Sequence, residues 1–142
     1  MQDQRRNVLK ILAAAPLMAC AAGCSSASGS AESFGKVPAG NVSSTTEGVL
    51  SVVPNAPAIL ARDKDGLYAM TITCTHQSCD VSPDGSTLYC ACHGSRFDSN
   101  GNVLQGPAGS PLVHFAVTLD AAGNITVDGT TQVTASTRTA VG

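Results

Sequence analysis

Short apolar runs alternate with turn-forming residues along most of the chain. The runs are rich in Val, Leu, Ile and Thr, which favour strands, and the segments between them contain Gly, Asn and Asp, which tolerate tight turns. No convincing helix is predicted after the N-terminal segment, so the chain is expected to be all-β. Strands are predicted at residues 49–53, 58–61, 67–72, 87–89, 112–119 and 124–127.

The N-terminal 24 residues have the pattern of a signal peptide. Arg5 and Arg6 precede an apolar run over residues 11–23, which is too short to span a bilayer. The sequence around the two arginines resembles a twin-arginine export motif, a route for folded proteins that suits a cofactor loaded before export. An ordinary Sec signal is the alternative, because paired arginines also serve as a plain basic region.

The cleavage site allows two interpretations. Residues 21–24 resemble a lipobox, which makes Cys24 a candidate lipidation site, whereas the small residues 19–21 also suit cleavage to a soluble protein. Residues 25–33 are rich in Ser, Gly and Ala and predict a flexible linker. We expect one folded domain over residues 34–128, and the polar, Thr-rich segment 129–142 predicts a mobile tail or a weak edge strand.

Composition limits the function classes. The net charge is −2 and 13% of the residues are charged, so nothing indicates a nucleic-acid partner. Three Phe, two Tyr and no Trp provide only a small core. Because so small a domain buries little surface, a cofactor or a crosslink would add needed stability, and the six cysteines of the chain make both feasible.

Two short boxes combine cysteine with histidine. Box one is residues 74–79, Cys-Thr-His-Gln-Ser-Cys, and box two is residues 90–95, Cys-Ala-Cys-His-Gly-Ser. Both residue types bind transition metals, so a structural zinc site is one interpretation. Zinc sites usually place two Cys together and two His together, however, whereas each box here mixes the two types.

The boxes resemble those of Rieske iron–sulfur proteins. That resemblance implies one [2Fe–2S] cluster, in which two Cys hold one iron and two His hold the other. It also implies an antiparallel β-sandwich whose cluster-binding subdomain is formed by two loops at one tip. The implied ligands are Cys74, His76, Cys90 and His93.

The same resemblance assigns further roles. Cys79 and Cys92 would form a disulfide that ties the two loops together, which an oxidising compartment permits. Residues 106–108 would form a proline loop over the cluster. Ser95 would donate its hydroxyl to a bridging sulfide, while Phe97 stands where high-potential members have Tyr, so both residues are expected to tune the potential.

The resemblance implies electron transfer, without a catalytic site in this chain. A Rieske oxygenase needs two further His and a carboxylate for a mononuclear iron, but only His114 remains, and we expect it to be an ordinary half-exposed strand residue. A ferredoxin that serves an oxygenase is the alternative carrier, although it predicts neither a signal peptide nor a spare cysteine pair.

The expected location and partners follow from the signal and the resemblance. The protein is expected to be exported and periplasmic, or anchored facing outward, with no membrane contact beyond the signal or a lipid. Its partner would be a cytochrome b- or c-type complex or the large subunit of a molybdenum oxidoreductase.

Overall fold

The computed structural model describes residues 32–142, which form two antiparallel sheets and one short 3-10 helix, Val42–Ser44. The strand orders are β1-β10-β9-β4-β3-β2 in the larger sheet and β5-β6-β7-β8 in the smaller sheet. The larger sheet contains β1 Lys36–Asn41, β2 Leu50–Val52, β3 Ala58–Asp63, β4 Gly66–Thr71, β9 His114–Leu119 and β10 Asn124–Val133. The smaller sheet contains β5 Val81–Asp84, β6 Thr87–Cys90, β7 Arg96–Phe97 and β8 Val103–Gln105.

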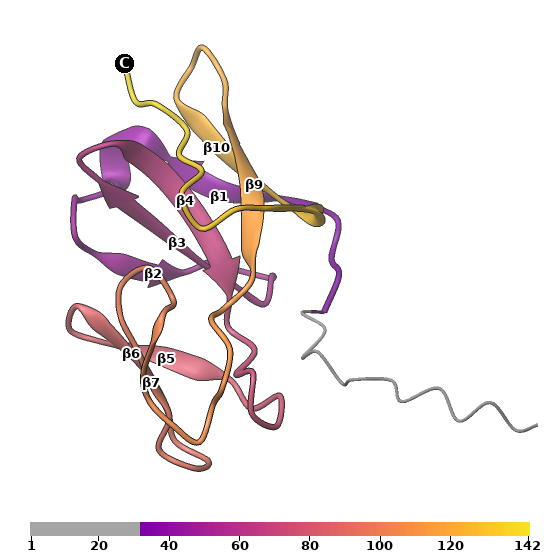
Figure 1. The fold of residues 1–142 in the computed structure, drawn as a ribbon. Helices are drawn as coiled ribbons and strands as arrows, with labels where there is room; N and C mark the ends of the chain where they lie inside the picture. The colour runs from indigo at the N-terminus through magenta and orange to yellow at the C-terminus, as the bar shows by residue number, and fades with distance from the viewer. Residues whose placement is uncertain (1–31) are drawn as a thin grey trace, which may run out of the picture.

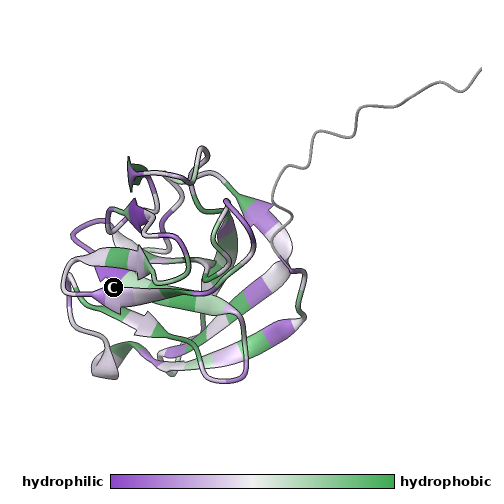
Figure 2. Cartoon of the chain, turned by 90° about the horizontal axis from the view of Figure 1, so that it is seen from below, coloured by the Kyte–Doolittle hydropathy of each residue, from purple (hydrophilic) through white to green (hydrophobic). Residues whose placement is uncertain are grey.

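The larger sheet is built around β4, which is buried along its whole length. It pairs with β3 in a hairpin that runs from Ala58 opposite Thr71 to Asp63 opposite Gly66, and with β9 on its other side. The start of β10 alternates buried and more exposed residues. Figure 2 shows hydrophobic and hydrophilic residues alternating along strands. The alternation is what a sheet with one solvated face requires.

The smaller sheet brings both cysteine–histidine boxes to one end of the molecule. In Figure 1 it lies below the larger sheet, and the loops at its lower end point away from that sheet. Val81, at the start of β5, pairs with Cys90, at the end of β6. The loop of residues 72–80 precedes β5, and the loop of residues 91–95 follows β6. Because Val81 and Cys90 are paired, these two loops lie side by side.

Two apolar clusters stabilise the fold. One surrounds Phe115 and the inner side of β10, where Phe34 packs edge-on with a ring-centroid distance of 5.0 Å. The other joins the two sheets and includes Phe97 together with the thiols of Cys74 and Cys90. The two loops that carry the cysteine–histidine boxes therefore rest on the core and are not appended to its surface.

The prediction of an all-β fold is confirmed, and each predicted strand overlaps an observed one. Strands β1, β5, β7 and β8 were not predicted. Pro38 and Gly40 lie inside β1, and Pro83 lies inside β5. Both residue types disfavour regular strands in isolation, and β7 is only two residues long, so partner strands decide these elements.

Residues 129–142 differ from the expected mobile tail or weak edge strand. Strand β10 continues to Val133, which pairs with His114 after a register shift. Further on, the backbone of Thr139 exchanges two hydrogen bonds of 2.8 Å with Leu67 in β4. The ordered structure thus extends beyond residue 128, because unpaired backbone groups of β4 and β9 accept this polar segment.

His114 was expected to be half-exposed and is instead 2% exposed. Its ring lies near-parallel to that of Tyr68, with centroids 6.2 Å apart. Burial lowers the pKa of His114, although a contact between its Nδ1 and the Leu112 carbonyl oxygen opposes this. A buried imidazole of lowered pKa is neutral near pH 7 and acts as part of the core.

The predicted signal peptide (1–24), the candidate lipidation site Cys24 and almost all of the linker (25–33) lie outside the described residues. Within residues 32–142, no helix has the length and apolar character needed to cross a membrane.

Replacing Gly66 tests the packing of the C-terminal segment. Gly66 has φ +137°, and a Cβ there would overlap the carbonyl oxygen of Thr139. Gly85 also has positive φ, at +63°, but a Cβ there meets nothing within 4 Å. We expect Gly66→Ala to lower the free energy of unfolding by roughly 1 to 3 kcal/mol more than Gly85→Ala does. Equal losses in denaturant titrations would contradict this packing.

Candidate metal centre

Box one forms a tight turn that two backbone hydrogen bonds close. The Ser78 N–H donates to the Cys74 carbonyl oxygen at 3.0 Å, and the Cys74 N–H donates to the Cys79 carbonyl oxygen at 2.7 Å. Ser78 has φ +58°, a left-handed conformation that costs a non-glycine residue on the order of 1 kcal/mol. The turn directs the chain back toward β5.

Box two repeats this backbone arrangement. The Gly94 N–H donates to the Cys90 carbonyl oxygen at 3.0 Å, and the Cys90 N–H donates to the Ser95 carbonyl oxygen at 2.9 Å. Gly94 has φ +82° and occupies the position that Ser78 holds in box one, without its steric cost. Each turn thus places one cysteine at its start with the histidine close behind.

The two turns bring two thiols together in the core. Cys74 and Cys90 are each 1% exposed and are both free. Burial raises the pKa of the Cys90 thiol, and its hydrogen bond with the Cys74 thiol raises it further. A bound cation is therefore what would hold this buried pair as thiolates.

The two imidazoles form a second pair. The ring centroids of His76 and His93 are 4.8 Å apart, and the rings are nearly perpendicular, at 84°. His76 Nδ1 is buried and has no hydrogen-bond partner, which is unusual for a buried polar atom. A metal ion would satisfy this nitrogen. His93 is the more exposed of the two histidines.

A disulfide connects the outer parts of the boxes. Cys79 and Cys92 are bonded, with an S–S distance of 2.12 Å and a separation of 13 residues in the sequence. This is the pairing that the family resemblance implied. The bond restricts how far the two turns can separate, so it supports the geometry of both the thiol pair and the imidazole pair.

A third loop, residues 106–113 between β8 and β9, is held against both boxes. The Thr75 hydroxyl donates to the Ser110 carbonyl oxygen at 2.6 Å, and the Gln105 amide donates to the Gly94 carbonyl oxygen at 3.2 Å. Neither Thr75 nor Gln105 was singled out from the sequence, because a single polar residue carries no signal of such a distant partner. Together these bonds hold the predicted proline loop beside the boxes.

Both residues expected to tune the potential are fully buried. The Ser95 hydroxyl oxygen accepts a hydrogen bond from the Ala108 N–H at 3.0 Å, which leaves its own proton without a protein acceptor among the described residues. Phe97 belongs to the same core cluster as Cys74 and Cys90. The residues at this end fit a Rieske-type [2Fe–2S] cluster, since they offer two buried thiols, two adjacent imidazoles and one unpartnered ring nitrogen.

Comparisons with known proteins agree with this donor set. Curated relatives include the cytochrome b6-f complex iron-sulfur subunit 2 of Trichormus variabilis, which is 36% identical over 91 residues, covering 57% of this chain and 51% of that protein. The chain spans about half or less of the length of the curated relatives that it matches.

Solved structures share the fold. The plasma membrane Rieske protein of Synechocystis PCC 6803 superposes with a TM-score of 0.51 at 27% identity, over 65% of this chain and 98% of that one. A chain from the complex of oxygenase and ferredoxin in carbazole 1,9a-dioxygenase has a TM-score of 0.51 at 26% identity, over 70% and 97% of the two chains.

The Rieske [2Fe–2S] domain matches residues 35–118, more than half of the chain. Proteins with this domain carry one [2Fe–2S] cluster, which exchanges single electrons. The chain therefore belongs to the Rieske [2Fe–2S] family.

Proposed function

We propose that Cys74 and Cys90 hold one iron of the cluster, that His76 and His93 hold the other, and that the chain passes single electrons to and from a redox protein outside the cytoplasmic membrane. The observation that carries the proposal is the pairing of two buried thiols beside two imidazoles, one of which has an unpartnered buried nitrogen.

The cluster supplies the redox chemistry, and the protein controls its surroundings. Two imidazoles in place of two thiolates leave the cluster less negative, which raises the potential from about −400 mV toward the Rieske range of about −150 to +300 mV. The buried side of the site excludes water around the thiols. The disulfide and the proline loop hold the two boxes so that little reorganisation accompanies electron transfer.

The imidazole side is the proposed exit for the electron. His93 is exposed, as are Ala91 and Pro107, whereas both thiols are buried. The two boxes and the proline loop, residues 74–79, 90–95 and 106–108, contain no Asp, Glu, Lys or Arg. Exposed Asp80 follows box one, and Arg96, which follows box two, is paired with Asp84 at 2.9 Å. A partner would therefore dock through short-range contacts around His93 and without long-range steering by charge.

Export and a role as a carrier subunit complete the proposal. The twin-arginine-like segment and the disulfide support an oxidising location, and the similarity to the Synechocystis plasma membrane Rieske protein supports a place at the plasma membrane. Partners of the cytochrome b/c type or a molybdenum oxidoreductase subunit fit such a site. A role as an enzyme is not proposed, because a mononuclear iron would need two further His, and His114, the one His left besides His76 and His93, is buried in the core.

A ferredoxin that delivers electrons to an oxygenase is the second candidate. The similarity to a chain of the carbazole 1,9a-dioxygenase complex supports it. Cell location distinguishes the exported carrier from the oxygenase ferredoxin. Fractionation that finds the protein only in the cytoplasm would favour the ferredoxin.

The central test is the composition of the purified protein. We expect about two iron atoms and two inorganic sulfides per chain, with a rhombic EPR signal after reduction, because Cys and His ligation makes the two irons inequivalent. Cys74→Ser should lose the iron. Cys79→Ser is the matched control, because it keeps the proposed ligands. It should retain iron in buffer but release it at a lower denaturant concentration than the wild type does. Zinc without iron would overturn the proposal.

Hydrogen bonding to the cluster should set its potential. Reduction adds negative charge, so a hydroxyl that donates to a cluster sulfur stabilises the reduced form more than the oxidised form. If that difference is about 1 to 2 kcal/mol, Ser95→Ala should lower the midpoint potential by roughly 40 to 90 mV. Phe97→Tyr should raise it by adding a donor. Shifts of the same sign in voltammetry of the two variants would mean that these roles are misassigned.

The absence of charges from the two boxes and the proline loop predicts electron transfer with little salt dependence. With a c-type cytochrome as the probe, the second-order rate constant should change less than about twofold between about 0.02 and 0.5 M salt. Gln77→Glu, which adds a charge at an exposed position of box one, should introduce a salt dependence. Thr118→Glu, near the end of β9 that lies away from the proline loop, should not. A steep salt dependence of the unmodified protein would contradict docking around His93.

A further inference from the structure

The segment after β10 lies beyond the residues that the family domain matches, yet it is firmly attached to the fold. Thr139 pairs with Leu67 through the backbone, and its hydroxyl donates to the Val117 carbonyl oxygen at 2.6 Å. Thr139 is therefore bonded to both β4 and β9. The residue just before, Arg138, is thereby held at a defined place.

Arg138 contacts the hairpin of the larger sheet. Its Nε donates to Asp63 Oδ2 at 2.6 Å, and its guanidinium carbon lies 3.9 Å from the centroid of the Tyr68 ring. Burial alone would raise the pKa of Asp63, but hydrogen bonds from Arg138 and from the amides of Asp65 and Gly66 hold it below its usual range. The carboxylate is thus ionised and bound on several sides.

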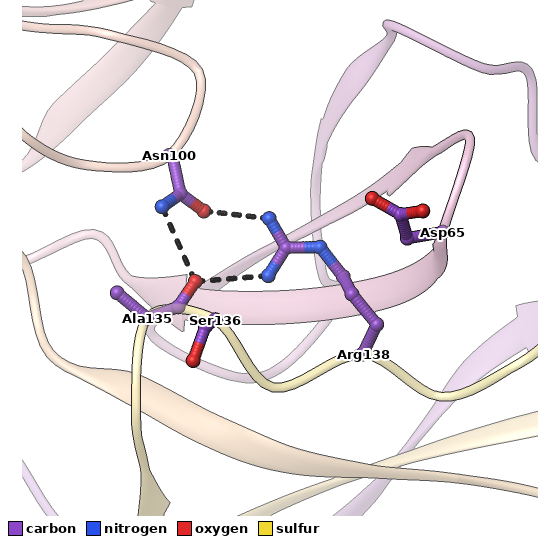
Figure 3. A pocket seen from close by; sticks show the side chains of 5 residues that line it. All are labelled: Asp65, Asn100, Ala135, Ser136 and Arg138. Atoms are coloured by element: carbon purple, nitrogen blue, oxygen red, sulfur yellow. Dashed lines mark hydrogen bonds between the residues drawn. The ribbon is translucent and has the colours of Figure 1, made fainter.

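The same guanidinium contacts the smaller sheet. Its Nη2 donates to Asn100 Oδ1 at 2.8 Å, and its Nη1 donates to the Ala135 carbonyl oxygen at 2.9 Å. That oxygen also accepts from Asn100 Nδ2 at 3.2 Å, so the three residues form the closed set of bonds visible in Figure 3. Asn100 belongs to the turn between β7 and β8.

This turn is linked to the buried surroundings of the proposed cluster. Tyr68 also holds it, because its hydroxyl donates to the Ser99 carbonyl oxygen at 2.8 Å. The turn follows Phe97, and its Gly101 carbonyl oxygen accepts from the Leu112 N–H at 2.9 Å. Phe97 and Leu112 both belong to the apolar core that also contains Cys74 and Cys90.

The Arg138–Asp63 pair differs from the ion pairs at the surface of the described residues. The Arg138 side chain is 15% exposed and the Asp63 side chain 33% exposed, and the two charged groups are 2.6 Å apart. By contrast, the Lys36 side chain is 75% exposed, and its Nζ lies 4.0 Å from Asp128 Oδ2. Partial burial reduces screening, and charged hydrogen bonds in such places are worth more than exposed pairs. Arg138 also makes several bonds from one planar group, which a lysine cannot do.

We propose that Arg138 is a positioning residue that clamps the β7–β8 turn, and with it the core side of the cluster-binding loops, onto the β3–β4 hairpin. The proposal rests on the proposed function of those loops. It assigns to the C-terminal segment a part in holding the redox site, although that segment lies outside the family match and contributes no ligand.

The test is hydrogen exchange of the full-length, cluster-loaded protein, followed by mass spectrometry, together with the rate of iron release to a chelator. In Arg138→Ala, amides of residues 98–102 and Leu112 should exchange at least about tenfold faster, whereas amides that pair β1 with β10 should be unchanged. Iron release should accelerate, and the EPR lines should broaden as the cluster surroundings become less uniform. Arg138→Lys should not restore the wild-type behaviour.

Two further variants keep the result decisive. Asn100→Ala removes only the link to the turn and should reproduce the local exchange of Arg138→Ala even if that variant folds poorly. Lys36→Ala removes a cation on β1 and should change nothing. In Asn100→Ala, wild-type exchange at residues 98–102, or a uniform increase over all strands, would overturn the clamp. Wild-type protein that lacks iron would instead overturn the proposed function, which the iron analysis shows separately.

Discussion

The side-by-side burial of two cysteine thiols is the constraint on which the rest of this structure depends. Cys74 and Cys90 are closed off from water within an apolar core, where a thiolate without a cation is strongly disfavoured. The proposed ligation of the cluster by these two cysteines resolves this conflict, because a metal cofactor would bind the deprotonated thiols and neutralise their charge. In such a protein, the free energy of cofactor binding is also free energy of folding.

The two sheets contribute differently to meeting this constraint. The larger sheet has a long central hairpin and its own apolar cluster, so it forms a framework of ordinary stability. The smaller sheet has strands as short as two residues and could not persist by pairing alone. It is held by the shared core around Phe97, by the disulfide and by the bonds that reach the β7–β8 turn from Tyr68 and Arg138.

Local patterns were enough to predict the central elements, and long-range contacts explain what was missed. The apolar runs around residues 58–61 and 67–72 indicated β3 and β4, and the two boxes pointed to the cofactor class without any structure. By contrast, β1 contains Pro38 and Gly40 and becomes a strand only because β10 offers a partner. The burial of His114 and the attachment of Arg138 likewise depend on residues far away in the sequence, which no local window contains.

The likeness of the two box turns has a consequence for how the tip comes apart. Both turns use the same pair of backbone hydrogen bonds, but box two has Gly94 at the left-handed position, whereas box one has Ser78. Box one therefore stores conformational strain that box two lacks, and relaxing it favours opening on that side. On this ground alone, we expect the turn that carries Cys74 and His76 to open before the turn that carries Cys90 and His93.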